Sequence, residues 1–202
     1  MNTLLSYLRV LFISAVIGFA AAAPSNAADL IKPTLAEDGL YHHAWFKDSF
    51  LDLRDDLKEA KEAGKRLVIF FEQVGCIYCK KMQTEVLAQK PINDYVRENF
   101  EVVQLNLWGS REVTDFDGKA MTEKEIAKRW RVVFTPTIVF LPETAGAGDK
   151  DGGQIEVARM PGAFEGGTFK AMFEWVHAKG YEGEEHFQKY VIRKMNERRQ
   201  GQ

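Results

Sequence analysis

The segment Leu67–Cys79, LVIFFEQVGCIYC, contains both cysteines of this 202-residue chain. Its first five residues are apolar and rich in β-branched and aromatic side chains, as expected of a buried central strand. Cys76 and Cys79 follow, and their two-residue separation suits the N-terminus of a helix. Because the positive end of a helix dipole favours a thiolate there, the segment predicts thiol–disulfide exchange as the first candidate chemistry.

Two other uses of the cysteine pair are a zinc site and an inert disulfide. A structural zinc needs four ligands, but none of the four histidines follows the cysteines at the spacing of a zinc knuckle. An inert bridge that closes so small a loop would stabilise the fold only modestly. We therefore expect no metal site, and no cofactor other than a redox-active disulfide between Cys76 and Cys79.

A second strand-like segment, VVFTPTIVFL at residues 132–141, is interrupted by Pro136. Proline cannot donate a hydrogen bond to a strand ladder, so it marks the first residue of a strand or weakens the strand assignment. Pro136 lies about sixty residues after Cys76. The order is then a strand, the cysteine pair, a helix and a strand that contains proline.

With these features the chain resembles the thioredoxin superfamily over residues 45–178, and more narrowly the secreted thioredoxin-like proteins of the SoxW type. The segment RMPGAF, residues 159–164, supports the resemblance because Gly162 matches a family glycine near the active-site surface. The resemblance implies an α/β thioredoxin fold: a central mixed β-sheet flanked by helices on both faces. A short insertion before the strand with the cis-proline and a C-terminal helix would complete it.

The resemblance also implies the roles of the site residues. Cys76 would attack a disulfide in a client protein, and the more buried Cys79 would resolve the mixed disulfide. The family places a cis-proline beside the cysteines, which would make the Thr135–Pro136 bond cis. The residues expected to contact the client are Ile77, Tyr78, Thr135 and Pro136.

A buried acid that assists proton transfer in cytosolic thioredoxins is missing from its usual position, where this chain has Phe70. Glu72 is the nearest acid and a candidate substitute. An exposed charge at the end of a strand is an equally good interpretation of Glu72.

Other departures leave the direction of electron flow open. Gly75 replaces the usual tryptophan before the first cysteine, and Ile77-Tyr78 replaces the Gly-Pro dipeptide of cytosolic thioredoxins. Tyr78 and Thr135 are similar to the corresponding residues of the DsbC and DsbG isomerases. The alternatives are thus a thiol reductase, a Dsb-type oxidase or isomerase, a thioredoxin-like protein of cytochrome c maturation, and a redox-inert binding module.

Two missing features favour a reductase of the SoxW kind, which is associated with sulfur oxidation. The isomerases have a separate dimerisation domain, which the polar residues 28–44 cannot supply, and oxidases commonly carry a much longer insertion than residues 108–121. The expected partners are a client protein with a disulfide and a membrane thiol transporter of the CcdA or SoxV kind as electron donor. We expect a monomer, and the net charge of −2 predicts no nucleic-acid partner.

The N-terminus predicts export to the periplasm. Arg9 precedes an apolar run of 14 residues, 10–23, and small residues lead to a cleavage site after about Ala27. This run is shorter than the ~20 residues that span a bilayer, although an uncleaved anchor is an alternative. We therefore divide the chain into a signal peptide (1–27), an N-terminal extension (28–44), a thioredoxin-like domain (45–180) and a charged C-terminal helix (181–202).

Helical spacing predicts elements on both sides of the cysteines. One helix would present Phe46, Phe50, Leu53, Leu57 and Ala60 on one face, a second would span 80–89, and a third would bury its apolar residues within 169–176. The tail helix would pack on its own domain rather than dock a partner.

The remaining patterns predict strands, a turn and a capped helix. Strands are expected at 101–107 and 154–160, and a tight turn at Asp117-Gly118 inside the insertion. Thr122 and Glu125 form a capping-box pattern. His42 and His43 are expected at the surface.

Overall fold

The structure, a computed structural model, describes residues 30–146 and 150–200 of the chain. The predicted signal peptide, residues 1–27, lies outside these ranges. Within them, no helix is both long enough and apolar enough to cross a membrane.

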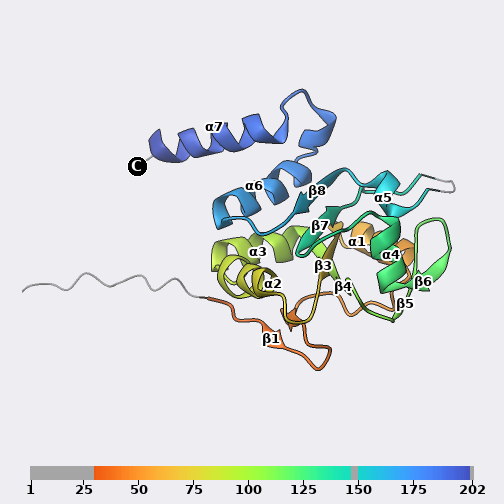
Figure 1. The fold of residues 1–202 in the computed structure, drawn as a ribbon. Helices are drawn as coiled ribbons and strands as arrows, with labels where there is room; N and C mark the ends of the chain where they lie inside the picture. Colours follow the sequence, from red (N-terminus) through yellow and green to blue (C-terminus); the bar gives the residue numbers. More distant parts are fainter. Residues whose placement is uncertain (1–29, 147–149, 201–202) are drawn as a thin grey trace, which may run out of the picture.

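A four-stranded sheet forms the centre of the fold (Figure 1). Its strand order is β4 (Phe100–Asn106), β3 (Arg66–Glu72), β7 (Thr137–Phe140) and β8 (Ala158–Pro161). The strands β3 and β4 are parallel, whereas β7 runs antiparallel to both β3 and β8. The predicted mixed sheet is therefore confirmed, and the apolar run before the cysteines is a strand with neighbours on both sides.

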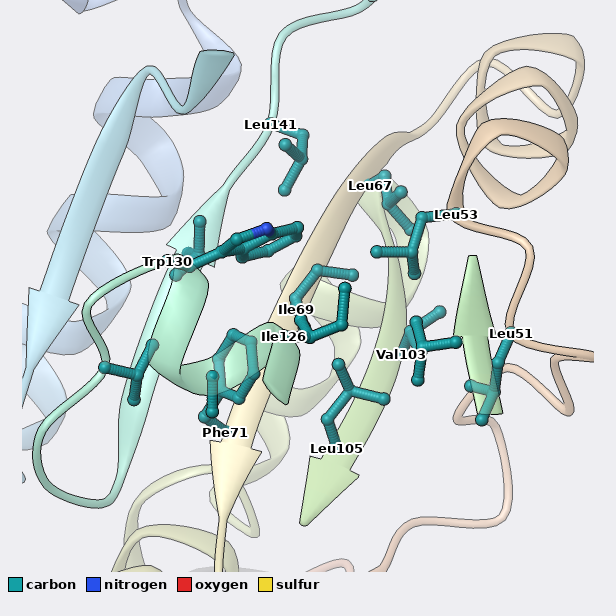
Figure 2. Close-up of a cluster of buried hydrophobic side chains, with 14 of the residues drawn as sticks. Leu51, Leu53, Leu67, Ile69, Phe71, Val103, Leu105, Ile126, Trp130 and Leu141 are labelled. Carbon is teal, nitrogen blue, oxygen red and sulfur yellow. The ribbon is translucent and has the colours of Figure 1, made fainter. Parts of the chain in front are cut away.

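The side chains of β3 alternate between two hydrophobic cores, because successive residues of a strand point to opposite faces. Leu67, Ile69 and Phe71 belong to one core, which Figure 2 shows in part. Val68 and Phe70 belong to the other. Every residue of β3 is buried, so this one strand contributes side chains to both hydrophobic cores.

Helices cover both faces of the sheet, as predicted. The helices α1 (Leu53–Glu62) and α4 (Glu123–Arg129) contribute to the core that contains Phe71. The helices α3 (Lys90–Asn99) and α6 (Gly166–His177) contribute to the core that contains Phe70. The apolar residues predicted within 169–176 are buried in α6.

The first helix starts later than its apolar pattern predicts. Asp52 caps it by accepting a hydrogen bond from the backbone N–H of Arg54 (3.1 Å). Phe50 precedes this cap and is fully exposed, and Phe46 packs edge-on against Phe70 in the opposite core (5.8 Å between ring centroids). The prediction that Phe46 and Phe50 lie on this helix is therefore wrong, because the cap overrides the spacing of apolar residues.

The helix predicted after the cysteines is also different. It consists of α2 (Ile77–Lys81) and one π-helical turn, η1 (Met82–Val86), in which the N–H of Leu87 donates to the carbonyl of Met82 (2.8 Å). Pro91 lies in the first turn of α3, where its missing N–H costs nothing. The predicted helix thus begins earlier than residue 80, and the proline starts the following helix.

The insertion contains the predicted turn. Two short antiparallel strands, β5 (Glu112–Thr114) and β6 (Ala120–Thr122), form a hairpin, and Gly118 has a φ of 82° in the connection between them. Thr122 and Glu125 form the predicted capping box at the start of α4. This hairpin therefore places α4 against the sheet without an additional domain.

The segment predicted as a strand over 154–160 begins as a helical turn. Asp151 and Gln154 form a capping box that starts the short helix α5 (Gly152–Ile155). The strand β8 is therefore confined to Ala158–Pro161, because the cap satisfies backbone groups that a longer strand would have paired.

A hairpin precedes the domain core and contradicts one prediction for the histidines. It consists of β1 (Thr34–Leu35) and β2 (Tyr41–His42). His43, directly after it, is 2% exposed, with its ring nitrogens near the carbonyl of Gln83 (3.3 Å) and the amide of Asn93 (3.2 Å). The prediction that His43 lies at the surface is wrong, because His43 anchors this segment to the core.

The C-terminal segment packs on its own domain in the structure. After the short helix η2 (Gly180–Glu182), α7 (Phe187–Gln200) lies alongside α6 (Figure 1). The ring of Phe187 lies 5.7 Å from that of Trp175, whose Nε1–H donates to the carbonyl of Glu185 (3.1 Å). These contacts agree with the prediction of a peripheral helix.

Candidate active site

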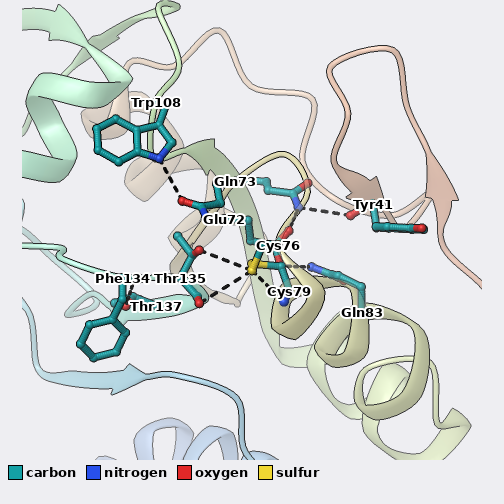
Figure 3. The surroundings of a disulfide bond; sticks show 11 residues. Tyr41, Glu72, Gln73, Cys76, Cys79, Gln83, Trp108, Phe134, Thr135 and Thr137 are labelled. Atoms are coloured by element: carbon teal, nitrogen blue, oxygen red, sulfur yellow. Dashed lines mark hydrogen bonds between the residues drawn. A yellow bond between two sulfur atoms is a disulfide. The ribbon is translucent and has the colours of Figure 1, made fainter.

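Cys76 and Cys79 form a disulfide at the start of α2, directly beyond the end of β3 (Figure 3). Cys76 is the N-cap residue of α2, and its Sγ accepts a hydrogen bond from the backbone N–H of Cys79 (3.0 Å). The first turn of α2 contains no acidic residue, and Lys80 and Lys81 follow. An N–H group and a helix N-terminus both favour a negative charge on sulfur once the bridge is reduced.

The two sulfur-bearing residues differ in their access to solvent. Cys79 is 4% exposed, whereas Cys76 is only half-buried. An incoming disulfide can therefore reach Cys76 but not Cys79. This asymmetry is what an attacking cysteine and a resolving cysteine require.

The loop before β7 brings Thr135 and Pro136 to the disulfide. The Thr135–Pro136 peptide bond is cis. The hydroxyl of Thr135 donates to Sγ of Cys76 (3.4 Å), and the backbone oxygen of Thr135 lies 3.7 Å from the same sulfur. The N–H of Gly162 donates to the carbonyl of Pro136 (2.8 Å), which ties β8 to this loop.

Exposed apolar side chains surround the disulfide. Ile77 and Tyr78, the two residues between the cysteines, are both exposed. Phe134 and Trp108 are exposed as well, and the indole N–H of Trp108 donates to the side-chain oxygen of Gln73 (2.9 Å). The sequence did not predict Phe134 as a site residue, although it lies next to the predicted Thr135.

Glu72 is buried beside the site, so the interpretation of an exposed charge at a strand end is wrong. Its side chain is held between two amides. Gln83 Nε2 donates to Oε1 (2.9 Å), as Figure 3 shows, and Gln104 Nε2 donates to Oε2. Neither glutamine was predicted as a site residue. Their only signal in the sequence is a polar side chain at a position that faces the core.

Burial dominates the titration of Glu72. Because the carboxyl is removed from water, its pKa is raised to about 8, although the hydrogen bonds from Gln83 and Gln104 act in the opposite direction. The carboxyl therefore keeps its proton at a pH where an ordinary glutamate has lost it. Its proton affinity is then close to that of a free thiol, with a reference pKa of about 8.5.

Replacing Glu72 with glutamine should change how stability depends on pH. Between about pH 4.5 and 8 the folded protein holds a proton on Glu72 that the unfolded chain has released, so the free energy of unfolding falls as the pH rises. One such group contributes at most about 1.4 kcal/mol per pH unit. Urea denaturation at several pH values should show this decline in the wild type and a smaller decline in E72Q.

The exposed Glu98 provides the matched control, because E98Q makes the same chemical change at a solvated position. Its stability should follow the wild type at every pH. If the difference between the wild type and E72Q stays constant from pH 5 to 8, the raised pKa of Glu72 is wrong.

A pocket of about 300 Å³ opens beside the disulfide. It is lined by both cysteines, by Glu72 and by residues of the N-terminal hairpin, including Leu35 and Tyr41. Glu72 and Cys79 therefore border the same space, which the sequence alone could not indicate. Among residues 30–146 and 150–200, no three His, Cys, Asp or Glu side chains are grouped so that they could hold a metal ion.

Several solved structures are similar to this chain. A thioredoxin-fold protein from Helicobacter pylori is 22% identical, covers 66% of this chain and 86% of its own, and superposes with a TM-score of 0.54. A thioredoxin from Thermus thermophilus is 27% identical, with coverages of 64% and 86% and a TM-score of 0.49. The periplasmic thioredoxin SoxS from Paracoccus pantotrophus is 23% identical, with coverages of 57% and 99% and a TM-score of 0.37.

The chain matches none of the curated proteins with which it was compared. A family model described as a thioredoxin-like domain matches residues 53–177, which is more than half of the chain. This range contains the whole central sheet, the cysteine pair and the cis-proline loop. The chain therefore belongs to the thioredoxin-like domain family.

Proposed function

We propose that this protein is an exported thiol–disulfide oxidoreductase that reduces disulfides in client proteins. The observation that carries the proposal is the asymmetric cysteine pair. Cys76 is accessible at a helix N-terminus, Cys79 is buried one turn further on, and Thr135 contacts the sulfur of Cys76. This geometry suits a nucleophile with an internal resolving thiol.

The reaction begins with the cysteine pair reduced. The thiolate of Cys76 attacks one sulfur of the client disulfide, which forms a mixed disulfide and releases the other client sulfur as a thiolate. The thiolate of Cys79 then attacks Sγ of Cys76, breaks the mixed disulfide and releases the second client sulfur. Two electrons pass to the client, and the protein retains the disulfide between Cys76 and Cys79.

Glu72 is the proposed proton acceptor for Cys79. The thiol of Cys79 must lose its proton before it attacks, and Glu72 borders the same pocket. Only the ionised form of Glu72 can accept this proton, and a pKa of about 8 leaves part of the carboxyl ionised near neutral pH. That ionised form takes a proton from a thiol at little free-energy cost, since the two proton affinities are similar. The proton then leaves to solvent or to the released client thiolate.

The proposed setting is the periplasm, where disulfides persist. The sequence of residues 1–27 supports export, and the resemblance to SoxW-type proteins supports a reductase that serves sulfur oxidation. A membrane thiol transporter of the CcdA or SoxV kind would return two electrons to the cysteine pair after each cycle. The chemistry uses no cofactor other than the two cysteines, and we propose that the protein works as a monomer.

The reduction potential of the cysteine pair tests the direction of electron flow. Equilibration with glutathione or dithiothreitol should give a value near the thioredoxin end of the scale, roughly −270 mV. A value near that of DsbA, roughly −120 mV, would instead indicate an oxidase or isomerase and would overturn the reductase proposal. Cysteines that never equilibrate with either reagent would identify an inert binding module.

A further inference from the structure

One wall of the pocket beside the disulfide comes from a part of the chain that precedes the matched thioredoxin-like region. Its walls are the hairpin residues Leu35, Leu40 and Tyr41 on one side and Val74 and Ile77 from the segment around Cys76 on the other. The family model begins at residue 53, after this hairpin. The N-terminal extension therefore adds one wall of the pocket to the thioredoxin-like domain, which supplies the other.

Specific contacts hold the hairpin in place. Gly39 has a φ of 78°, and its backbone lies so close to Val74 that an added Cβ would be 2.9 Å from Cγ2 of that valine. Gln104 Nε2 donates to the backbone oxygen of Tyr41 (3.2 Å) as well as to Glu72. The hairpin is thus fastened both to the loop that carries Cys76 and to a strand of the central sheet.

We propose that this pocket binds an apolar side chain of the client, at a position next to the client cysteine that reacts with Cys76. The inference rests on the proposed oxidoreductase function and adds a subsite to it. The subsite lies on the side of Cys76 opposite to Thr135, as Figure 3 shows for Thr135 and Tyr41. A client segment that crosses Cys76 would contact Thr135 on one side and the hairpin on the other.

Location and size argue for a side chain as the occupant. Since Cys76 and Cys79 form part of the wall, an occupant must lie within one or two residues of the sulfur that reacts. A volume of about 300 Å³ is at the small end of the range for ligand pockets, and it suits one large side chain rather than a helix.

The chemistry of the walls argues for an apolar side chain. Four aliphatic residues line the pocket, and Leu35 and Val74 are more than half exposed, which leaves apolar surface in water until something covers it. The charged residues of the lining are Glu72, which is buried between two amides, and Lys80, whose Nζ lies 6.0 Å from the centre of the Tyr41 ring. An aliphatic or aromatic client residue therefore fits better than a charged one.

Symmetric peptide disulfides test the proposal directly. Each is a dimer of one short peptide joined through its single cysteine, with leucine or asparagine placed directly before or directly after that cysteine. The rate constant of reduction by the reduced protein is measured for each dimer. We expect leucine at one of the two positions to raise this rate constant about tenfold over asparagine, the discrimination that a small hydrophobic pocket achieves.

Leu35 is the residue to change, because it is exposed and contributes to the pocket without touching the proposed chemistry. L35N should remove the preference for leucine and leave the rate with glutathione disulfide within about twofold. Ile192 is an equally exposed aliphatic residue on α7, so I192N is the matched control and should keep the preference.

Four results would overturn the inference in different ways. Equal rates for the leucine and asparagine peptides, or an undiminished preference in L35N, would remove the subsite and leave the oxidoreductase proposal intact. A preference lost equally in L35N and I192N would show a general effect of surface polarity. Failure of the wild type to reduce any disulfide would overturn the proposed function together with the subsite.

Discussion

Replacing Cys79 with serine should stop turnover and leave Cys76 joined to a client as a stable mixed disulfide. Cys76 is the more exposed of the two and keeps its position at the start of α2. A serine hydroxyl cannot take the place of the resolving thiolate, so the first step proceeds and the second does not. Activity should fall to the background rate of the reductant alone. Non-reducing gels should show mixed disulfides between the variant and its client, which a thiol reductant cleaves.

The reciprocal variant is the control for the order of attack. C76S should neither turn over nor trap a client, because the remaining Cys79 is buried. Adducts found with C76S but not with C79S would reverse the two roles. Adducts with neither variant would contradict the proposed exchange chemistry.

Replacing Trp130 with alanine should lower the free energy of unfolding by about 3–5 kcal/mol, as expected for a large aromatic residue in a core. Trp130 is 1% exposed and packs edge-on against Phe71 of the central strand, with 5.6 Å between ring centroids (Figure 2). It also stacks on Phe116 (6.2 Å). Its indole N–H donates to the buried carboxylate of Asp115 (3.0 Å), which would lose this partner.

The same substitution at the exposed Trp108 is the control, because it removes a tryptophan without removing a buried side chain. Trp108 is 64% exposed, so W108A should change stability by no more than about 0.5 kcal/mol. Urea denaturation followed by circular dichroism measures both variants. If W130A and W108A lower the free energy of unfolding by similar amounts, the burial of Trp130 does not account for its contribution to stability.

Local patterns were enough to predict the centre of the fold. The apolar run 67–71 has the pattern expected of a buried strand, and it is one; the spacing of the cysteines after it suits a helix start, which is where they lie. Because proline cannot donate to a ladder, Pro136 marks the first residue of a strand or weakens the strand assignment, and β7 begins directly after it at Thr137. These inferences depend on residues that are close together in the sequence.

The environment of Glu72 could not be predicted in this way. Its two amide partners come from η1 and β4, at sequence separations of 11 and 32 residues. Nothing near Glu72 in the sequence shows that these side chains meet it in the interior. His43 was misplaced for the same reason, since its partner Asn93 lies 50 residues away.

Capping explains the misplaced boundaries. Asp52 and Asp151 each start a helix where apolar periodicity alone suggested something else. A cap acts through one hydrogen bond to the backbone, so it leaves almost no periodic signal in the sequence. The hairpin that lines one side of the pocket was not predicted either, because residues 28–44 show no strand pattern and were interpreted only as an N-terminal extension.

The bridge between Cys76 and Cys79 has a further consequence, because it links the stability of the fold to its redox behaviour in one thermodynamic cycle. The loop that it closes contains only two residues, so breaking it gives the unfolded chain little extra freedom. The difference in unfolding free energy between oxidised and reduced protein must then equal the difference in potential between the folded and unfolded pair, at about 1.4 kcal/mol for every 30 mV. If the oxidised form is the more stable, folding lowers the reduction potential of the cysteine pair and makes it a stronger reductant. If the reduced form is the more stable, folding raises the potential and makes the pair a stronger oxidant.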